Sequence, residues 1–171
     1  MKNVFLVGMP SSGKSTLGRR LARRLNYGFV DLDKLIVEDQ RHTIPEIFAQ
    51  EGEAYFRKVE QRILRAVPPN QSLVVATGGG APCFFDNMDF IKESGISVFL
   101  NVVPPELAAR ILNHNKDDRP LLSGVSNLRD ELAARLAIRL PYYSQADFTI
   151  THKTSLPEIV ALVRPRLRKK A

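Results

Sequence analysis

The chain has 171 residues, of which 44% are hydrophobic and 25% charged, with a net charge of +7 and one cysteine. This length suits one domain spanning residues 1–171. No apolar run approaches the ~20 residues that are needed to cross a bilayer. Because Cys83 is the single cysteine, a disulfide framework and a cysteine metal cluster are excluded. The apolar part of MKNVFLVG is too short for a signal peptide, so we expect a cytoplasmic protein without a membrane partner.

The first elements are a short apolar run at 3–8, typical of a buried strand, and an amphipathic helix at 14–26. Leu17, Leu21 and Leu25 share one face of this helix, and an arginine cluster at 19–24 lies opposite. The positive charge of the chain favours an anionic partner, and nucleic acid is one candidate. Ordinary amphipathicity explains the cluster better as a solvated helix face.

The later elements continue this alternation of strands and helices. We expect strands at 28–32, 72–77, 96–102 and 148–151, and helices at about 33–40, 45–50, 53–67, 85–93, 105–113, 128–140 and 156–167. Such alternation predicts an α/β fold, with a parallel sheet covered by helices on both faces. The polar stretch at 114–127 is interpreted as a mobile loop.

The motif GMPSSGKS at 8–15 fits the spacing G-x-x-x-x-G-K-[ST], between a strand and a helix. Glycines let the loop curl until its N–H groups point at phosphate oxygens, and the helix N-terminus adds partial positive charge. Lys14 can reach the β and γ phosphates, while Ser15 can ligate Mg²⁺. The motif predicts a bound nucleotide but leaves open what receives its phosphate.

Asp31 and Asp33 stand two residues apart at the end of the second strand. Alternation along a strand would point both side chains the same way, toward the ligand site at the carboxyl edge of the sheet. One could support Mg²⁺ and the other could take a proton from an attacking hydroxyl. Alternatively, Asp33 merely caps the next helix.

Three glycines, Gly78–Gly80, close the third strand, where they would admit a ligand closely. Arg57 and Glu60 can pair beside the apolar face of the helix at 53–67, which would present the arginine to an anion. Arg139 precedes Pro141 near a helix end, and Arg119 lies in the polar loop, from which it could close over a phosphoryl group. Taken singly, each arginine is more simply a solvated charge, but together these residues predict a phosphotransferase with a small, hydroxyl-bearing acceptor.

The chain also resembles the shikimate kinases, from Val4 to about residue 160. The resemblance rests on the order and approximate spacing of GMPSSGKST (8–16), DLD (31–33), FRKVE (56–60), GGG (78–80), RPLL (119–122) and RLPYY (139–143). It implies the fold of the nucleoside monophosphate kinases: three layers, α/β/α, with a five-stranded parallel sheet, a mobile lid at about 114–126 and a substrate-binding helical region at about 33–62. The implied reaction is Mg-ATP-dependent phosphorylation of the 3-hydroxyl of shikimate, a step toward chorismate and the aromatic amino acids.

The resemblance also implies roles for individual residues. Asp33, Lys14 and Arg119 would be catalytic, and Ser15 and Asp31 would serve Mg²⁺. Shikimate would be bound by Asp33, Arg57, Gly79, Gly80 and Arg139. ATP would be bound by Gly8, Ser11, Ser12, Gly13, Lys14, Ser15, Thr16, Arg110 and Arg119, with Arg110 near the adenine. Many members of the family have glycine at the position of Ser11, so the loop departs from the family there.

Two alternatives to this function stay open from the sequence. Another small-molecule kinase of the same fold could act on gluconate or a nucleotide, although a nucleotide acceptor would need a base pocket. A nucleic-acid-binding ATPase would need contiguous exposed basic residues and salt-sensitive binding. No apolar heptad demands a partner, so we expect a monomer.

Overall fold

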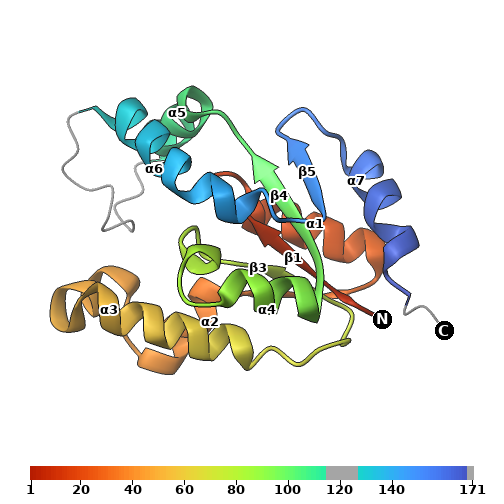
Figure 1. Cartoon of the computed structure of the whole chain (residues 1–171), viewed down its shortest axis with the longest axis horizontal. Coiled ribbons are helices and arrows are strands. Elements are labelled where there is room, and N and C mark those ends of the chain that lie inside the picture. Colours follow the sequence, from red (N-terminus) through yellow and green to blue (C-terminus); the bar gives the residue numbers. More distant parts are fainter. Residues whose placement is uncertain (115–126, 169–171) are drawn as a thin grey trace.

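The computed structural model describes residues 1–114 and 127–168. Five strands form one sheet: β1 (Asn3–Val7), β2 (Gly28–Asp31), β3 (Leu73–Ala76), β4 (Gly95–Asn101) and β5 (Phe148–Thr151). Their order is β2-β3-β1-β4-β5, and all four pairings are parallel (Figure 1). The predicted five-stranded parallel sheet is confirmed.

Helices cover both faces of this sheet, which makes three layers (Figure 1). Their bounds are α1 (Lys14–Leu25), α2 (Leu32–Gln40), α3 (Ile44–Arg65), α4 (Asn87–Ser94), α5 (Pro104–His114), α6 (Leu128–Tyr143) and α7 (Leu156–Val163), with 3₁₀ turns η1 (Ala81–Cys83) and η2 (Arg164–Arg166). Within the described ranges, none of these helices combines the length and apolar character needed to cross a bilayer.

Strand β1 shows how the sequence produces the two outer layers. All five of its residues are buried, as expected of a central parallel strand. Val4 and Leu6 pack into a core with α1 and α7, whereas Phe5 and Val7 pack into a larger core with helices α2 to α6. Alternate side chains of one strand thus hold opposite helical layers.

Several helix boundaries differ from the sequence-based prediction. The helices expected at 45–50 and 53–67 form one element, α3, with a break at Gly52, whose φ of 82° lies outside the helical region. A capping box between Thr43 and Glu46 fixes the start of α3 at Ile44. Helix α6 continues through Pro141 to Tyr143 instead of ending at Leu140. A proline this near the C-terminus removes one hydrogen bond without stopping the last turn.

Candidate active site

The loop between β1 and α1 has the backbone that its motif predicts. Gly8 and Gly13 have φ values of 149° and 97°, where residues with side chains are strained. A Cβ on Gly8 would lie 2.8 Å from the carbonyl oxygen of Leu100, so the first glycine is also needed for space. Gly13 is the N-cap of α1 and has no side chain to occupy the first N–H groups of that helix. The loop therefore offers backbone donors to an anion.

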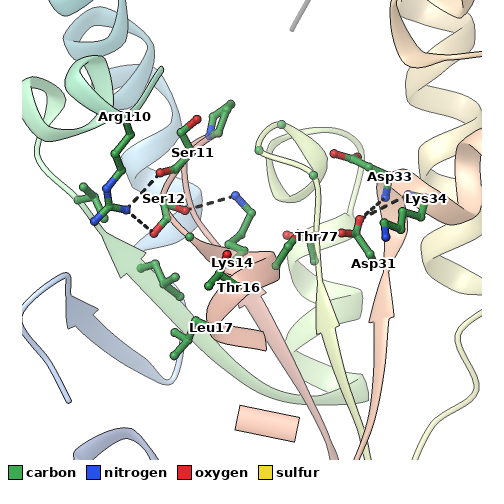
Figure 2. A pocket seen from close by; sticks show the side chains of 18 of the residues that line it. Ser11, Ser12, Lys14, Thr16, Leu17, Asp31, Asp33, Lys34, Thr77 and Arg110 are labelled. Carbon is green, nitrogen blue, oxygen red and sulfur yellow. Dashed lines mark hydrogen bonds between the residues drawn. The ribbon is translucent and has the colours of Figure 1, made fainter. Parts of the chain in front are cut away.

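Lys14 is buried and folds back over this loop. Its Nζ donates to the carbonyl oxygens of Gly8 and Met9, at 2.8 Å each, and approaches Ser12 Oγ at 3.4 Å (Figure 2). These contacts hold an ammonium group at the mouth of the loop, where phosphate oxygens would bind. Lys14 therefore lies at the phosphate-binding loop, and its contact with phosphate stays a prediction.

Ser15 and Asp31, the two residues expected to serve Mg²⁺, are in contact with each other. Ser15 Oγ donates to Asp31 Oδ2 at 2.7 Å, while Asp31 Oδ1 accepts from the backbone N–H groups of Asp33 and Lys34 (Figure 2). A hydroxyl and a carboxylate are hard oxygen donors, and Mg²⁺ typically takes one or two carboxylates beside water and phosphate. The described residues contain no cluster of three acidic, histidine or cysteine ligands. A small site of this kind fits Mg²⁺ held together with a nucleotide.

The alternative that Asp33 caps the helix is wrong, because the N-cap of α2 is Asp31. The strand ends at Asp31, so strand alternation does not orient Asp33; its place in the first turn of α2 does. Asp33 Oδ1 lies 3.1 Å from where a Cβ on Gly78 would be. Asp33 and Asp31 both line the same cavity, as expected from the sequence.

Arg57 is held on α3 by two carboxylates. Its Nη1 donates to Glu60 Oε1 at 2.9 Å, and its Nε and Nη2 contact Glu53 Oε1 at 3.3 and 3.2 Å. The guanidinium also lies over the ring of Phe84, 4.1 Å from the centroid. Only 4% of Arg57 is exposed, so its fork is fixed before any ligand arrives.

Glu60 lines the cavity beside Arg57, although it was not among the predicted site residues. Its side chain is 1% exposed. Burial raises the pKa of Glu60 from 4.5 to about 7; Arg57 opposes this shift, Asp33 adds to it, and Arg139 opposes it weakly. The three charged groups therefore lie close enough to act on one carboxylate. The signal in the sequence was its spacing of three residues from Arg57 on one helix.

Gly78–Gly80, hereafter the glycine turn, make room for the protein's own side chains. A Cβ on Gly78 would lie 2.6 Å from Glu60 Oε2, one on Gly79 2.6 Å from Pro10 Cδ, and one on Gly80 2.5 Å from Arg57 Nη1. Each distance is below ordinary van der Waals contact. The turn brings the phosphate-binding loop, Arg57 and Glu60 together.

Arg139 reaches the same region from α6. It is 7% exposed, and its Nη1 is buried without a hydrogen-bond partner among the described residues. A buried, unsatisfied guanidinium nitrogen is costly, so an anionic ligand bound there would be stabilised. Arg139 and Arg57 both line the same cavity.

Arg110 lies against the outside of the phosphate-binding loop. Its Nη1 donates to the carbonyl oxygens of Ser11 and Ser12 at 3.2 and 3.1 Å, and Nε contacts Glu106 at 3.0 Å (Figure 2). His114, Thr151, His152 and Thr154 line the cavity on the same side. No motif in the sequence includes His114 or His152, so neither was expected to have a role; His114 is the last residue of α5.

One cavity of about 1080 Å³ connects these groups. That volume exceeds what a single small ligand needs, and its walls contain loop, acidic, arginine and glycine-turn residues together. Of the predicted site residues that the structure describes, all but Gly8 line it. Gly8 instead accepts from Lys14 through its carbonyl, and Arg119 lies outside the described residues, as does the expected lid apart from His114.

Comparison with known proteins agrees with this geometry. The family model described as shikimate kinase matches residues 10–167. A shikimate kinase of Bacteroides thetaiotaomicron is 44% identical over 150 residues, or 86% of this chain and 85% of the relative. The crystal structure of a shikimate kinase from that organism has a TM-score of 0.86 at 38% identity, over 95% of this chain and 98% of the other. The structure of Acinetobacter baumannii shikimate kinase in complex with shikimate has a TM-score of 0.86 at 36% identity, over 98% and 92% of the two chains. The chain therefore belongs to the shikimate kinase family.

Proposed function

We propose that the chain transfers the γ-phosphoryl group of ATP to the 3-hydroxyl of shikimate, which gives shikimate 3-phosphate and ADP. The observation that carries this proposal is the pair Arg57 and Arg139: two buried arginines that line one cavity together with the phosphate-binding loop. A guanidinium fork matches a carboxylate with two parallel hydrogen bonds. Shikimate supplies the carboxylate and, on the same small ring, the hydroxyl.

The acceptor would bind between the two arginines and Asp33. Its carboxylate would accept a hydrogen bond from Nη1 of Arg139, which has no partner among the described residues. The same carboxylate would bind the guanidinium of Arg57. Backbone N–H groups of Gly79 and Gly80 would add contacts. Asp33 would then receive the hydroxyl at the opposite end of the ring. Helices α2 and α3, within the region predicted at about 33–62, would form this half of the site.

The chemical step needs few protein groups. The hydroxyl oxygen attacks the γ-phosphorus, the bond to the bridging oxygen of ADP breaks, and Asp33 accepts the hydroxyl proton. Lys14 and the N–H groups of the loop stabilise negative charge on the phosphates. Mg²⁺ would be ligated by the hydroxyl of Ser15, with the carboxylate of Asp31 nearby, and would neutralise the negative charge of the phosphates. Arg110 would border the adenine side, and Arg119 would act as a lid arginine.

The direct test is ADP release by the purified protein with Mg-ATP and one acceptor at a time. We expect turnover with shikimate and none with gluconate or a nucleoside monophosphate. The reverse pattern would reject the proposal. Arg57→Lys should raise the KM for shikimate by roughly 10- to 100-fold, because lysine loses the bidentate fork, and should leave the KM for ATP within about twofold.

Arg62→Lys is the matched control on the same helix. Arg62 forms an exposed ion pair with Asp39, and such pairs contribute little. The control should therefore behave as the wild type. Equal effects of the two substitutions would remove Arg57 from the acceptor site.

We further propose a monomeric, cytoplasmic protein with no nucleic-acid partner. Several of its arginines are engaged locally: Arg65 pairs with Asp86, and Arg19 and Arg166 lie over the rings of Phe29 and Phe148. Salt-sensitive binding of DNA or RNA in a mobility-shift titration would contradict the last point.

A further inference from the structure

Tyr143 contacts the glycine turn and the phosphate-binding loop from the end of α6. It is the last residue of α6, one turn after Arg139, and is fully buried. Its ring packs on Phe99 with centroids 5.1 Å apart. Its hydroxyl donates to the carbonyl oxygen of Gly79 and lies 3.8 Å from Met9 Sδ. One phenol thus contacts the glycine turn and the phosphate-binding loop.

The bond to Gly79 fixes more than one atom. A peptide unit is planar, so the carbonyl of Gly79 and the N–H of Gly80 point in opposite directions across the same plane. Holding the carbonyl on Tyr143 therefore sets the direction of the next N–H. On its other side Gly79 packs against Pro10, with no room for a Cβ. The turn is held from two sides.

The hydroxyl remains a donor at neutral pH. Burial raises the pKa of Tyr143, and the neighbouring Arg139 guanidinium opposes that shift. Because the phenol stays protonated, its O–H continues to donate to Gly79. Arg139 and Tyr143, four residues apart, lie on one face of α6, so the helix presents an arginine to the cavity and a phenol to the turn.

We propose that Tyr143 is a positioning residue for acceptor binding: through its bond to Gly79 it sets the glycine turn in register with Arg139. The proposal rests on the proposed function, in which Gly80 and Arg139 contact the acceptor. The alternative is that Tyr143 only fills the core through its ring. In that case phenylalanine would serve equally well.

Tyr143→Phe removes the hydroxyl and keeps the ring, and Tyr142→Phe is the matched control. Tyr142 is the preceding residue of the same helix and is exposed. We expect Tyr143→Phe to raise the KM for shikimate about 10-fold, because the carbonyl of Gly79 loses its buried partner, while kcat and the KM for ATP stay within about twofold. Tyr142→Phe should change none of them.

Hydrogen exchange of the ligand-free protein supplies a readout that needs no acceptor. Amides of residues 77–81 and 83 should exchange roughly 10-fold faster in Tyr143→Phe than in the wild type, whereas in Tyr142→Phe they should exchange at the wild-type rate. If shikimate is not a substrate but exchange still rises, the proposed function fails while the bond to the turn stands.

Three results would overturn the proposal. The first is a Tyr143→Phe protein with wild-type KM and exchange. The second is a Phe99→Leu variant, which keeps the hydroxyl, raising the KM as much as Tyr143→Phe does. The third is a Tyr143→Phe protein that does not fold, since the hydroxyl would then be a requirement of the whole fold.

Discussion

Glu60→Gln should change how the stability of the protein depends on pH. The pKa of Glu60 is raised from 4.5 to about 7 by burial. The folded state therefore holds this proton more tightly than the unfolded state does. Its contribution to stability is fully present below pH 4.5 and is lost as the pH rises through about 7. At about 1.4 kcal/mol per pKa unit, the loss is about 3 kcal/mol.

Glutamine keeps the volume of Glu60 and does not titrate, so the mutant lacks this loss. The Tm of the wild type should fall relative to that of Glu60→Gln between pH 4.5 and 8. For a domain of this size about 1 kcal/mol corresponds to 2–4 °C, so the relative fall is on the order of 10 °C. Thermal melts followed by circular dichroism at half-unit pH steps would measure it.

Glu53→Gln is the control, because Glu53 binds the same guanidinium from an exposed position. Its Tm should keep the pH dependence of the wild type and differ from it by the small amount typical of an exposed ion pair. Parallel curves for Glu60→Gln and the wild type, within about 2 °C at every pH, would refute a raised pKa at Glu60.

The remaining predictions concern catalysis, the glycine turn and the phosphate-binding loop. Asp33→Asn should lower kcat by ~10²-fold or more in the shikimate assay, since Asp33 is not the helix cap; near-normal kcat would exclude Asp33 as the base. Gly80→Ala would place a Cβ 2.5 Å from Arg57 Nη1, so a urea titration should show a free energy of unfolding lower by about 1–3 kcal/mol. The KM for shikimate should also rise. Unchanged values of both quantities would show that Arg57 can move aside. Ser11 has a φ of 63°, so Ser11→Gly should relieve about 1 kcal/mol of strain and raise the Tm by about 2–4 °C; an unchanged or lower Tm would contradict this.

The sequence predicted the sheet and the phosphate-binding loop well because both depend on local patterns. Buried parallel strands are continuous apolar runs, and β1 needed only its own residues to be identified. The loop required only glycines and a lysine at a fixed spacing. The ends of helices were predicted less accurately. The helix before Pro141 was expected to end at Leu140, whereas α6 continues to Tyr143, whose ring packs on Phe99.

The acceptor half of the site could not be derived from local patterns. Burial raises the pKa of Glu60 and the charge of Asp33 on α2 adds to the shift, and neither cause is encoded by the neighbours of Glu60 in the chain. The glycine turn was expected to leave space for a ligand. Its three residues do line the cavity, and their missing Cβ atoms also make room for Arg57, Glu60 and Pro10. The resemblance to a family identified these residues, while their mutual contacts required the fold.

The glycine turn also limits how this enzyme could be redesigned. Groups from α3 and from the phosphate-binding loop occupy the space of its three missing Cβ atoms, so enlarging a residue there displaces a side chain needed for another task. A library aimed at new acceptors should leave the turn unchanged. Val37, Ile44 and Phe48 line the cavity from α2 and α3; their apolar side chains offer the wall where the size of the acceptor can be varied.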